Sequence, residues 1–126
     1  QATFSERVGV YSLYRFSDIA FERNNAADRM LTRTLKIAMH ETGHMFSMKH
    51  CTKYECLMSG TNHLGETDRR PLDSCPECMA KVVWAMNYDP VERYNNLAAF
   101  WRKNGKPNEA KSMLEKGRAV TSVDKK

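Results

Sequence analysis

Long apolar runs are missing from this 126-residue chain. No stretch approaches the roughly 20 apolar residues that a membrane-spanning helix needs, so we expect no membrane contact. The first residues also lack the pattern of a secretory signal. Disulfides belong mainly to secreted proteins, so they are a poor explanation for the four cysteines, and we expect a cytoplasmic or nuclear protein.

Nucleic-acid binding has little support either. The net charge is +5, but aromatic residues do not interleave with the basic ones as a stacking platform requires. A solvated terminus explains the basic residues at the end more simply than an acidic partner does. Hydrophobic residues make up 41% of the chain, as in an ordinary soluble domain. We predict one domain over residues 1–117 and a disordered basic tail over residues 118–126.

Spacing of the apolar residues predicts a strand, a long helix and a loop. Residues 7–16 are rich in valine and aromatic residues, which is typical of a strand. Residues 47–72 have no helical period, and we predict an ordered loop held by something other than an apolar core. Between them, from about residue 26 to residue 46, apolar side chains recur three and four apart. The predicted inner stripe of this helix comprises Met30, Leu31, Leu35, Ala38 and Met39.

Three further helices are predicted in the second half of the chain. Pro76 and Pro90 open the first two, because proline suits the first helical position. The second of them runs to about residue 104, where Gly105 suits a helix end, and the third covers residues 107–116. The last two resemble a single tetratricopeptide-type hairpin, which cannot bury its own apolar face and needs a neighbour.

The sequence HETGH at residues 40–44 is an HExxH pattern inside the long predicted helix. Side chains four apart share a helical face, so His40 and His44 can bind one zinc ion beside Glu41. The pattern is short, and two unrelated surface or core histidines would also explain it. His50, six residues after His44, becomes a third ligand if the chain turns near Ser47. Three ligands leave one position for a zinc-activated water, from which Glu41 would take a proton as general base.

Four cysteines follow in two close pairs separated by 18 residues, namely Cys51 with Cys56 and Cys75 with Cys78. This layout predicts a second, structural zinc site, whose binding energy would stabilise the loop. Four free buried cysteines and two disulfides are the alternatives. His50 and Cys51 are adjacent, so in an extended segment they would face opposite sides, and loss of the structural zinc should misplace His50.

The run HETGHMFSMKHCTKYECLM, with CPEC further on, closely resembles the archaemetzincins, especially their eukaryotic members. The likeness extends from about residue 1 to residue 101. It implies an α+β, metzincin-like zinc metallopeptidase domain with an active-site helix, a four-cysteine zinc loop and C-terminal helices. It also implies that Met58 lies in a turn beneath the metal and supports the site without binding zinc. Simple core packing would explain a methionine outside this motif.

Two features depart from the family pattern. Ser47 occupies the place of a family glycine that adopts a left-handed conformation, at a cost of roughly 1–2 kcal/mol for another residue. The family domain has further strands and a helix upstream, so we expect an N-terminally shortened domain. His63 lies outside the motif, and an ordinary surface role is a simpler explanation for it than substrate contact.

The resulting hypothesis is a monomeric zinc metallopeptidase that binds two zinc ions and hydrolyses peptide or protein substrates. The alternative is a zinc-stabilised interaction module with a weak or inactive site, which the shortened N-terminus and Ser47 favour. Glu41 favours the enzyme, because a module needs the metal ligands but has no use for a general base.

Overall fold

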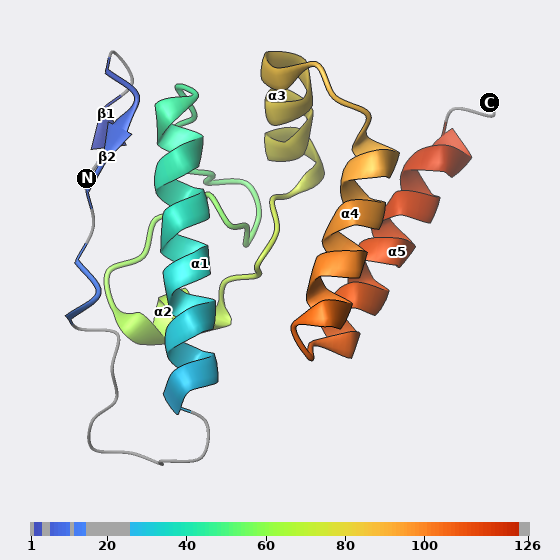
Figure 1. Cartoon of the computed structure of the whole chain (residues 1–126). Coiled ribbons are helices and arrows are strands. Elements are labelled where there is room, and N and C mark those ends of the chain that lie inside the picture. The colour runs from blue at the N-terminus through green and yellow to red at the C-terminus, as the bar shows by residue number, and fades with distance from the viewer. Residues whose placement is uncertain (1, 4–5, 11, 15–25, 124–126) are drawn as a thin grey trace. The chain divides into compact units, whose positions relative to one another are not determined.

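The computed structural model describes residues 2–3, 6–10, 12–14 and 26–123, and this part of the chain is mostly helical (Figure 1). It divides into two compact units, residues 1–82 and residues 83–126. The sequence predicted one domain over residues 1–117, and this stays a prediction. Within the second unit the last two helices pack on each other. Within the described ranges, no helix has both the length and the apolar character needed to cross a membrane.

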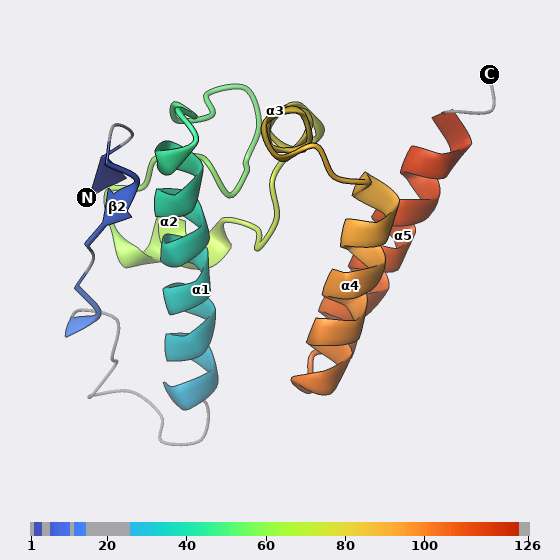
Figure 2. The same ribbon diagram turned by 45° about the horizontal axis from the view of Figure 1, so that its top comes forward.

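The N-terminal strands are short. β1 (Ala2–Thr3) and β2 (Val8–Gly9) pair antiparallel, with Ala2 opposite Gly9, and both lie beside helix α1 in two views (Figures 1 and 2). The predicted strand over residues 7–16 is therefore wrong in extent: Arg7 has a left-handed φ of 50°, and residues 12–14 are not in a strand. Residues 11, 15 and 16 lie outside the described ranges. Valine and aromatic residues favour a strand, but pairing decides its length.

Helix α1 (Ala26–Met45) confirms the long predicted helix. Its most buried side chains are not the apolar stripe, however, but Arg33, Lys36 and His40, which are 4%, 5% and 6% exposed. Leu31 from the predicted stripe is 45% exposed. These three polar residues share one helical face because they are three and four positions apart. The inner face of α1 is thus polar, and it needs polar partners.

Helix α2 (Leu64–Arg69) lies within the segment that the sequence predicted as a loop. Its start is capped reciprocally. His63 Nδ1 accepts a hydrogen bond from the Glu66 N–H at 3.4 Å, and a Glu66 carboxylate oxygen accepts one from the Asn62 N–H at 2.7 Å. A helix of six residues is too short for a periodic pattern, but this capping pair was a usable signal.

The polar face of α1 is satisfied by α2. Arg33 forms two hydrogen bonds with the Asp68 carboxylate, at 2.7 and 2.6 Å. Lys36 donates to the backbone carbonyls of Thr67 and Asp68, at 3.0 and 2.7 Å. A guanidinium group that binds both oxygens of a carboxylate sets the orientation of the two side chains as well as pairing their charges. The end of α2, and the residue that follows it, are therefore held at one place along α1.

Sulfur-containing side chains form the buried centre of the first unit. Met48, Cys56, Met58, Cys75 and Cys78 make one buried cluster, against which Cys51 and Val82 pack. Two of these cysteines come from helix α3 (Pro76–Met86) and the residue before it, as the proline at its first position predicted. The loop is thus held mainly by cysteines and methionines, which agrees with the expectation that no ordinary apolar core supports it.

The second unit is an antiparallel hairpin of helix α4 (Pro90–Lys103) and helix α5 (Pro107–Val123), side by side in both ribbon views (Figures 1 and 2). Asp89 caps α4 by accepting hydrogen bonds from two backbone N–H groups, at 2.7 and 3.3 Å. Gly105, with φ of 71°, allows the reversal between the helices. The buried side chains of the hairpin are Tyr94, Ala98, Trp101, Ala110 and Met113.

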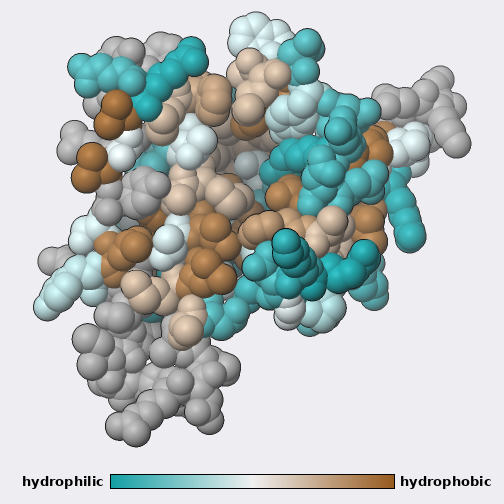
Figure 3. Space-filling view, viewed as in Figure 1, coloured by the Kyte–Doolittle hydropathy of each residue, from teal (hydrophilic) through white to brown (hydrophobic). Residues whose placement is uncertain are grey.

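Helix α5 extends beyond its predicted end at residue 116. It continues through residue 123, so residues 118–123 are helical where the sequence predicted a disordered tail, while residues 124–126 lie outside the described ranges. The hairpin supplies the reason, because Gly117 permits a close approach to Tyr94: a Cβ there would lie 3.3 Å from Tyr94 Cβ. Hydrophilic side chains, teal in the space-filling view, gather on the visible face of this hairpin (Figure 3).

Candidate metal centre

Three histidines converge where α1 ends. His40 and His44 lie one helical turn apart on α1, and His50 follows after the chain has turned back. The ring centroids are 4.6, 5.1 and 5.0 Å apart, and one ligand nitrogen from each ring lies within 4.8 Å of the others. The sequence predicted this group and the turn that it requires.

The turn is a Schellman motif centred on Ser47. Met48 N–H donates to the Gly43 carbonyl at 3.1 Å, and Ser47 N–H donates to the His44 carbonyl at 3.0 Å. Ser47 has φ of 63°, the left-handed conformation in which a side chain costs about 1–2 kcal/mol. The chain thus leaves the helix in the left-handed conformation that glycine adopts easily, and at Ser47 this conformation is strained.

Backbone carbonyls orient two of the rings. His40 Nδ1 lies 2.9 Å from the Leu57 carbonyl oxygen, and His44 Nδ1 lies 2.7 Å from the Met48 carbonyl oxygen. These contacts direct both Nε2 atoms toward each other, 3.0 Å apart. Burial lowers the pKa of His40, as does the charge of Arg70, against the opposing effect of the Leu57 carbonyl. A neutral imidazole is the form that binds metal.

Glycines bring the surrounding loop close to the site. A Cβ on Gly43 would lie 2.4 Å from Met58 Sδ, so the buried methionine packs directly on the backbone of α1. A Cβ on Gly60 would lie 3.0 Å from His50 Nδ1. The segment that carries Met58 therefore packs on α1 between the two helical histidines, and Gly60 leaves room for the third ring. The supporting role of Met58 stays a prediction.

Four cysteines form a second group. One Sγ atom from each of Cys51, Cys56, Cys75 and Cys78 lies within 4.8 Å of the others, and all four are free thiols. Cys51 Sγ and Cys75 Sγ are 3.9 Å apart. A tetrahedral zinc with bonds of about 2.3 Å would space its sulfurs by about 3.8 Å, so the group fits this metal.

The surroundings of the sulfurs favour a thiolate at Cys51 but not at Cys56. Burial raises the pKa of Cys51, but the backbone N–H groups of Tyr54 and Lys53 outweigh it and lower the pKa to about 7. Cys56 Sγ accepts hydrogen bonds from the N–H groups of Cys75 and Met58, at 3.2 and 3.4 Å. Burial still raises the pKa of Cys56. A metal cation would supply the missing stabilisation of negative charge.

The two groups are joined through the chain. His50 and Cys51 are consecutive, and the Cys51 N–H donates to the Met58 carbonyl at 2.9 Å. The residue next to the third histidine is thus bound to the segment that packs between the first two. We therefore expect a displacement of Cys51 to move His50 as well.

The remaining predicted residues have distinct places. Glu41 is half-buried on α1, next to His40. His63 caps α2 with its side chain mostly exposed and lies 3.5 Å from a Glu66 oxygen, so its role is local, as the simpler explanation held. Arg70 was not singled out in the sequence, although it is buried against His40. No pattern marks it, because only folding brings α2 to the histidines.

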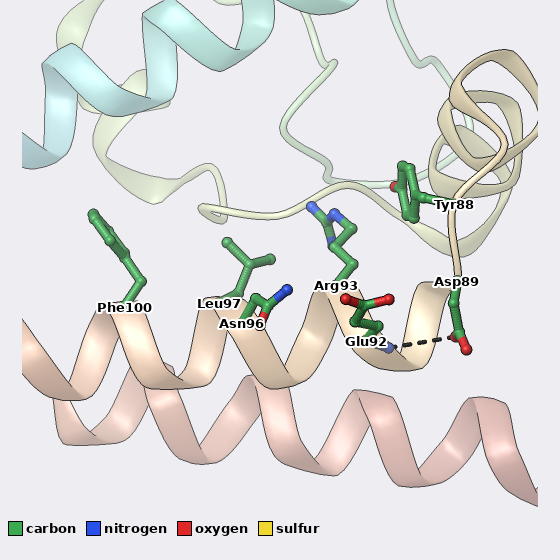
Figure 4. A pocket seen from close by; sticks show the side chains of 7 residues that line it. All are labelled: Tyr88, Asp89, Glu92, Arg93, Asn96, Leu97 and Phe100. Carbon is green, nitrogen blue, oxygen red and sulfur yellow. Dashed lines mark hydrogen bonds between the residues drawn. The ribbon is translucent and has the colours of Figure 1, made fainter.

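A pocket in the second unit stands apart from this chemistry. Its side chains project from the face of α4 that is turned away from α5, and from the residues that precede α4 (Figure 4). The pocket shares no residue with either group of ligands. The lining residues are Tyr88, Asp89, Glu92, Arg93, Asn96, Leu97 and Phe100.

Two histidines four apart on a helix, with a glutamate next to the first, are the HExxH pattern typical of zinc metallopeptidases, and here a third imidazole lies beside them. The sequence pattern of Peptidase family M54 matches residues 4–83, and the chain belongs to this family. The family assignment agrees with the resemblance found in the sequence.

The chain is also similar to proteins named archaemetzincins. It is 48% identical over 68 residues to Archaemetzincin-2 of Homo sapiens, covering 54% of this chain and 19% of the relative. Archaemetzincin-2 of Rattus norvegicus is 38% identical over 97 residues, covering 77% and 25%. Archaemetzincin of Thermococcus kodakarensis is 32% identical over 77 residues, covering 61% and 41%. The chain thus spans about a fifth of the human relative. No solved structure matches it.

Proposed function

We propose that this chain carries the active site of a metzincin-like zinc metallopeptidase that hydrolyses peptide bonds. His40, His44 and His50 would hold one zinc ion, and the convergence of their rings is the observation that carries the proposal. The four cysteines would hold a second, structural zinc. A peptide or protein substrate, a monomeric state and a cytoplasmic or nuclear location are part of the same proposal.

Each residue has a defined task. Zinc held by the three imidazoles would act as a Lewis acid toward a peptide carbonyl and toward water. Glu41, one position after a ligand, would take a proton from the attacking water and return it to the leaving amine. Met58 would support the site by packing on the backbone of Gly43, between the two helical histidines. The Leu57 and Met48 carbonyls would orient the rings of His40 and His44.

A specific observation favours a second candidate, a zinc-stabilised interaction module with little activity. Ser47 carries left-handed strain at the turn that positions His50. The module would keep both groups of ligands but would make no use of Glu41.

A Glu41→Gln variant separates the two candidates. Zinc per chain is measured on protein purified without added metal, and cleavage is measured on a mixed peptide library. The variant is expected to keep its zinc and to lose cleavage by about 10²–10⁴-fold. Glu55→Gln, at an exposed carboxylate that pairs with Arg69, is the matched control and should cleave normally.

The other outcomes are equally informative. Zinc in all three proteins without cleavage in any would support the interaction module. Cleavage retained in Glu41→Gln would remove Glu41 from its role. Less than one zinc per chain in the unaltered protein would contradict both candidates.

A further inference from the structure

Ser59 lies between two residues that contact the region of the histidines. It follows Met58, which packs on the backbone of Gly43, and it precedes Gly60, at which a Cβ atom would lie 3.0 Å from His50 Nδ1. Ser59 itself is half-buried. Its position therefore bears on how the chain passes both α1 and the third histidine.

The backbone of Ser59 closes a turn. Its N–H donates to the Cys56 carbonyl at 2.9 Å, which makes a β-turn with Leu57 and Met58 at its centre. In this turn the Met58 N–H donates to the Cys56 sulfur at 3.4 Å, and the Leu57 carbonyl oxygen lies 2.9 Å from His40 Nδ1. One turn thus positions a sulfur of the cysteine group and a carbonyl beside the histidines.

The hydroxyl of Ser59 adds two hydrogen bonds to the same turn. Ser59 Oγ accepts from the Cys56 N–H at 3.0 Å and donates to the Tyr54 carbonyl at 3.0 Å. A hydroxyl can donate and accept at once. Both backbone groups of Cys56 therefore bond to Ser59, and Cys56 is 0% exposed. An alanine at position 59 would take away the partner of this N–H, and a buried backbone N–H without a partner is costly.

Cys56 depends on this support because the loop before it is exposed. Residues 52–55, which separate Cys51 from Cys56, all lie at the surface, so their position depends on polar contacts such as the one between Tyr54 and Ser59. The Cys56 sulfur in turn accepts a hydrogen bond from the Cys75 N–H at 3.2 Å. The length and closure of the loop therefore decide whether the first pair of cysteines reaches the second.

We propose that Ser59 is a positioning residue of the cysteine group: its hydroxyl closes the loop and fixes Cys56 among the four sulfurs. This role rests on the proposed function only in taking the four cysteines as metal ligands. Ser59 binds neither metal nor substrate in it. The residue acts through the backbone of Cys56.

The test uses the full chain with Ser59→Ala and Ser59→Thr, and with Ser122→Ala as the matched control. The Ser122 hydroxyl donates to the Ala119 carbonyl at 2.8 Å on α5, a helix without candidate ligands, so the control removes one comparable hydrogen bond. Cobalt(II) is added to metal-free protein, and its thiolate charge-transfer absorbance is recorded. This absorbance reports the cysteine group alone, because the histidine group has no thiolate. Zinc then displaces the cobalt, which gives the zinc affinity of the cysteines.

Ser59→Ala should lower the zinc affinity of the cysteines by about 10–100-fold, as loss of other partners of metal ligands does. Its thiolate absorbance per bound cobalt should also fall, because Cys56 no longer reaches the metal. Ser59→Thr should restore both, since it keeps the hydroxyl, and Ser122→Ala should match the unaltered chain. A loss of folding stability alone would leave the absorbance per bound cobalt unchanged.

Circular dichroism checks the fold of each variant. Should metal-free Ser59→Ala not fold, the readout is the cobalt concentration at which it folds, because metal binding and folding are then coupled. This concentration should exceed that of Ser59→Thr by about 10–100-fold. Equal concentrations would contradict the proposal.

Equal zinc affinity and equal thiolate absorbance in folded Ser59→Ala would overturn the role of Ser59. So would an unaltered chain whose cysteines bind neither metal, and that result would remove the second zinc from the proposed function as well. One metal per chain, held by the cysteines and not by the histidines, would instead refute the proposed peptidase. The thiolate absorbance of the variants would then still decide whether Ser59 positions Cys56.

Discussion

The side chain of Met58 lies directly on the backbone of Gly43, so closely that a Cβ atom on Gly43 would come within 2.4 Å of the methionine sulfur. Gly43 lies between the two helical histidines, and Met58 is 1% exposed. Gly43 is therefore needed for packing, because the absence of a side chain lets the loop that carries Met58 come close to the backbone of α1. This contact makes the first prediction.

Replacing Gly43 with alanine should destabilise the protein by about 1–3 kcal/mol, as overpacking of a buried site does. Without the contact with Met58, glycine to alanine in a helix interior would stabilise the protein by about 1 kcal/mol. A loss of stability in place of a gain would therefore indicate the clash. The free energy of unfolding is measured in urea. In a double-mutant cycle with Met58→Ala, the combined loss should fall short of the sum. Strict additivity would show that the two residues do not clash.

Ser47→Gly should stabilise the protein by about 1 kcal/mol, because the left-handed φ of 63° is free of strain for glycine. The Schellman hydrogen bonds involve backbone only and should persist. Ser47→Ala is the control, since alanine meets the same restriction and should bring no gain. A matching gain in both variants would mean that the serine side chain, and not its backbone angle, is unfavourable.

Cys78→Ser should weaken metal binding at the histidines as well as at the cysteines. Loss of one sulfur ligand releases Cys51, and the adjacent His50 then shifts. We expect a fall in affinity of at least about tenfold at the histidine cluster, measured by chelator competition. Lys81→Ala, at an exposed position of the same helix, is the control. Full affinity at the histidines in Cys78→Ser would show that the two groups are independent.

The ion pair of Asp68 with Arg33 should make the stability of the first unit depend on pH in the acid range. Hydrogen bonds with Arg33 hold the pKa of Asp68 below the usual 3.8, despite the opposing effect of burial. A lowered folded-state pKa adds stability above the unfolded pKa, near pH 4, and this stability is lost as pH falls through the lower, folded value. Because the Asp68 side chain is 41% exposed and solvent screens the pair, Asp68→Asn should cost about 0.5–1 kcal/mol at neutral pH and progressively less in acid.

Urea unfolding between pH 2 and pH 7 measures this difference. Glu77→Gln is the matched control, because Glu77 pairs with Lys53 at the surface and should contribute little at any pH. An Asp68→Asn loss that stays constant over this range would mean that the carboxylate charge is not what binds Arg33.

The sequence was most informative where chemistry needs particular residue types at particular spacings. The helix around HETGH, the turn at Ser47 and the pairing of the two cysteine groups follow from local geometry. Proline and glycine marked the ends of α4 for the same reason. Such features need no knowledge of distant contacts.

Features that depend on a distant partner were missed or wrongly drawn. The strand predicted over residues 7–16 is only two residues long in β2, because its length is set by pairing with β1 and not by its composition. The buried face of α1 is polar because α2 brings Asp68 and backbone carbonyls against it. Helix α2 itself is short, and contacts with α1 hold it.

By itself, the sequence determined which side chains make up the two groups of candidate metal ligands, since helical periodicity and short loops bring near neighbours together. Only the tertiary structure decided what lies around them. Arg70 is 30 residues from His40 along the chain, and their contact exists because Arg33 and Lys36 fix the end of α2. A buried charge with no local pattern is visible only once the chain has folded around it.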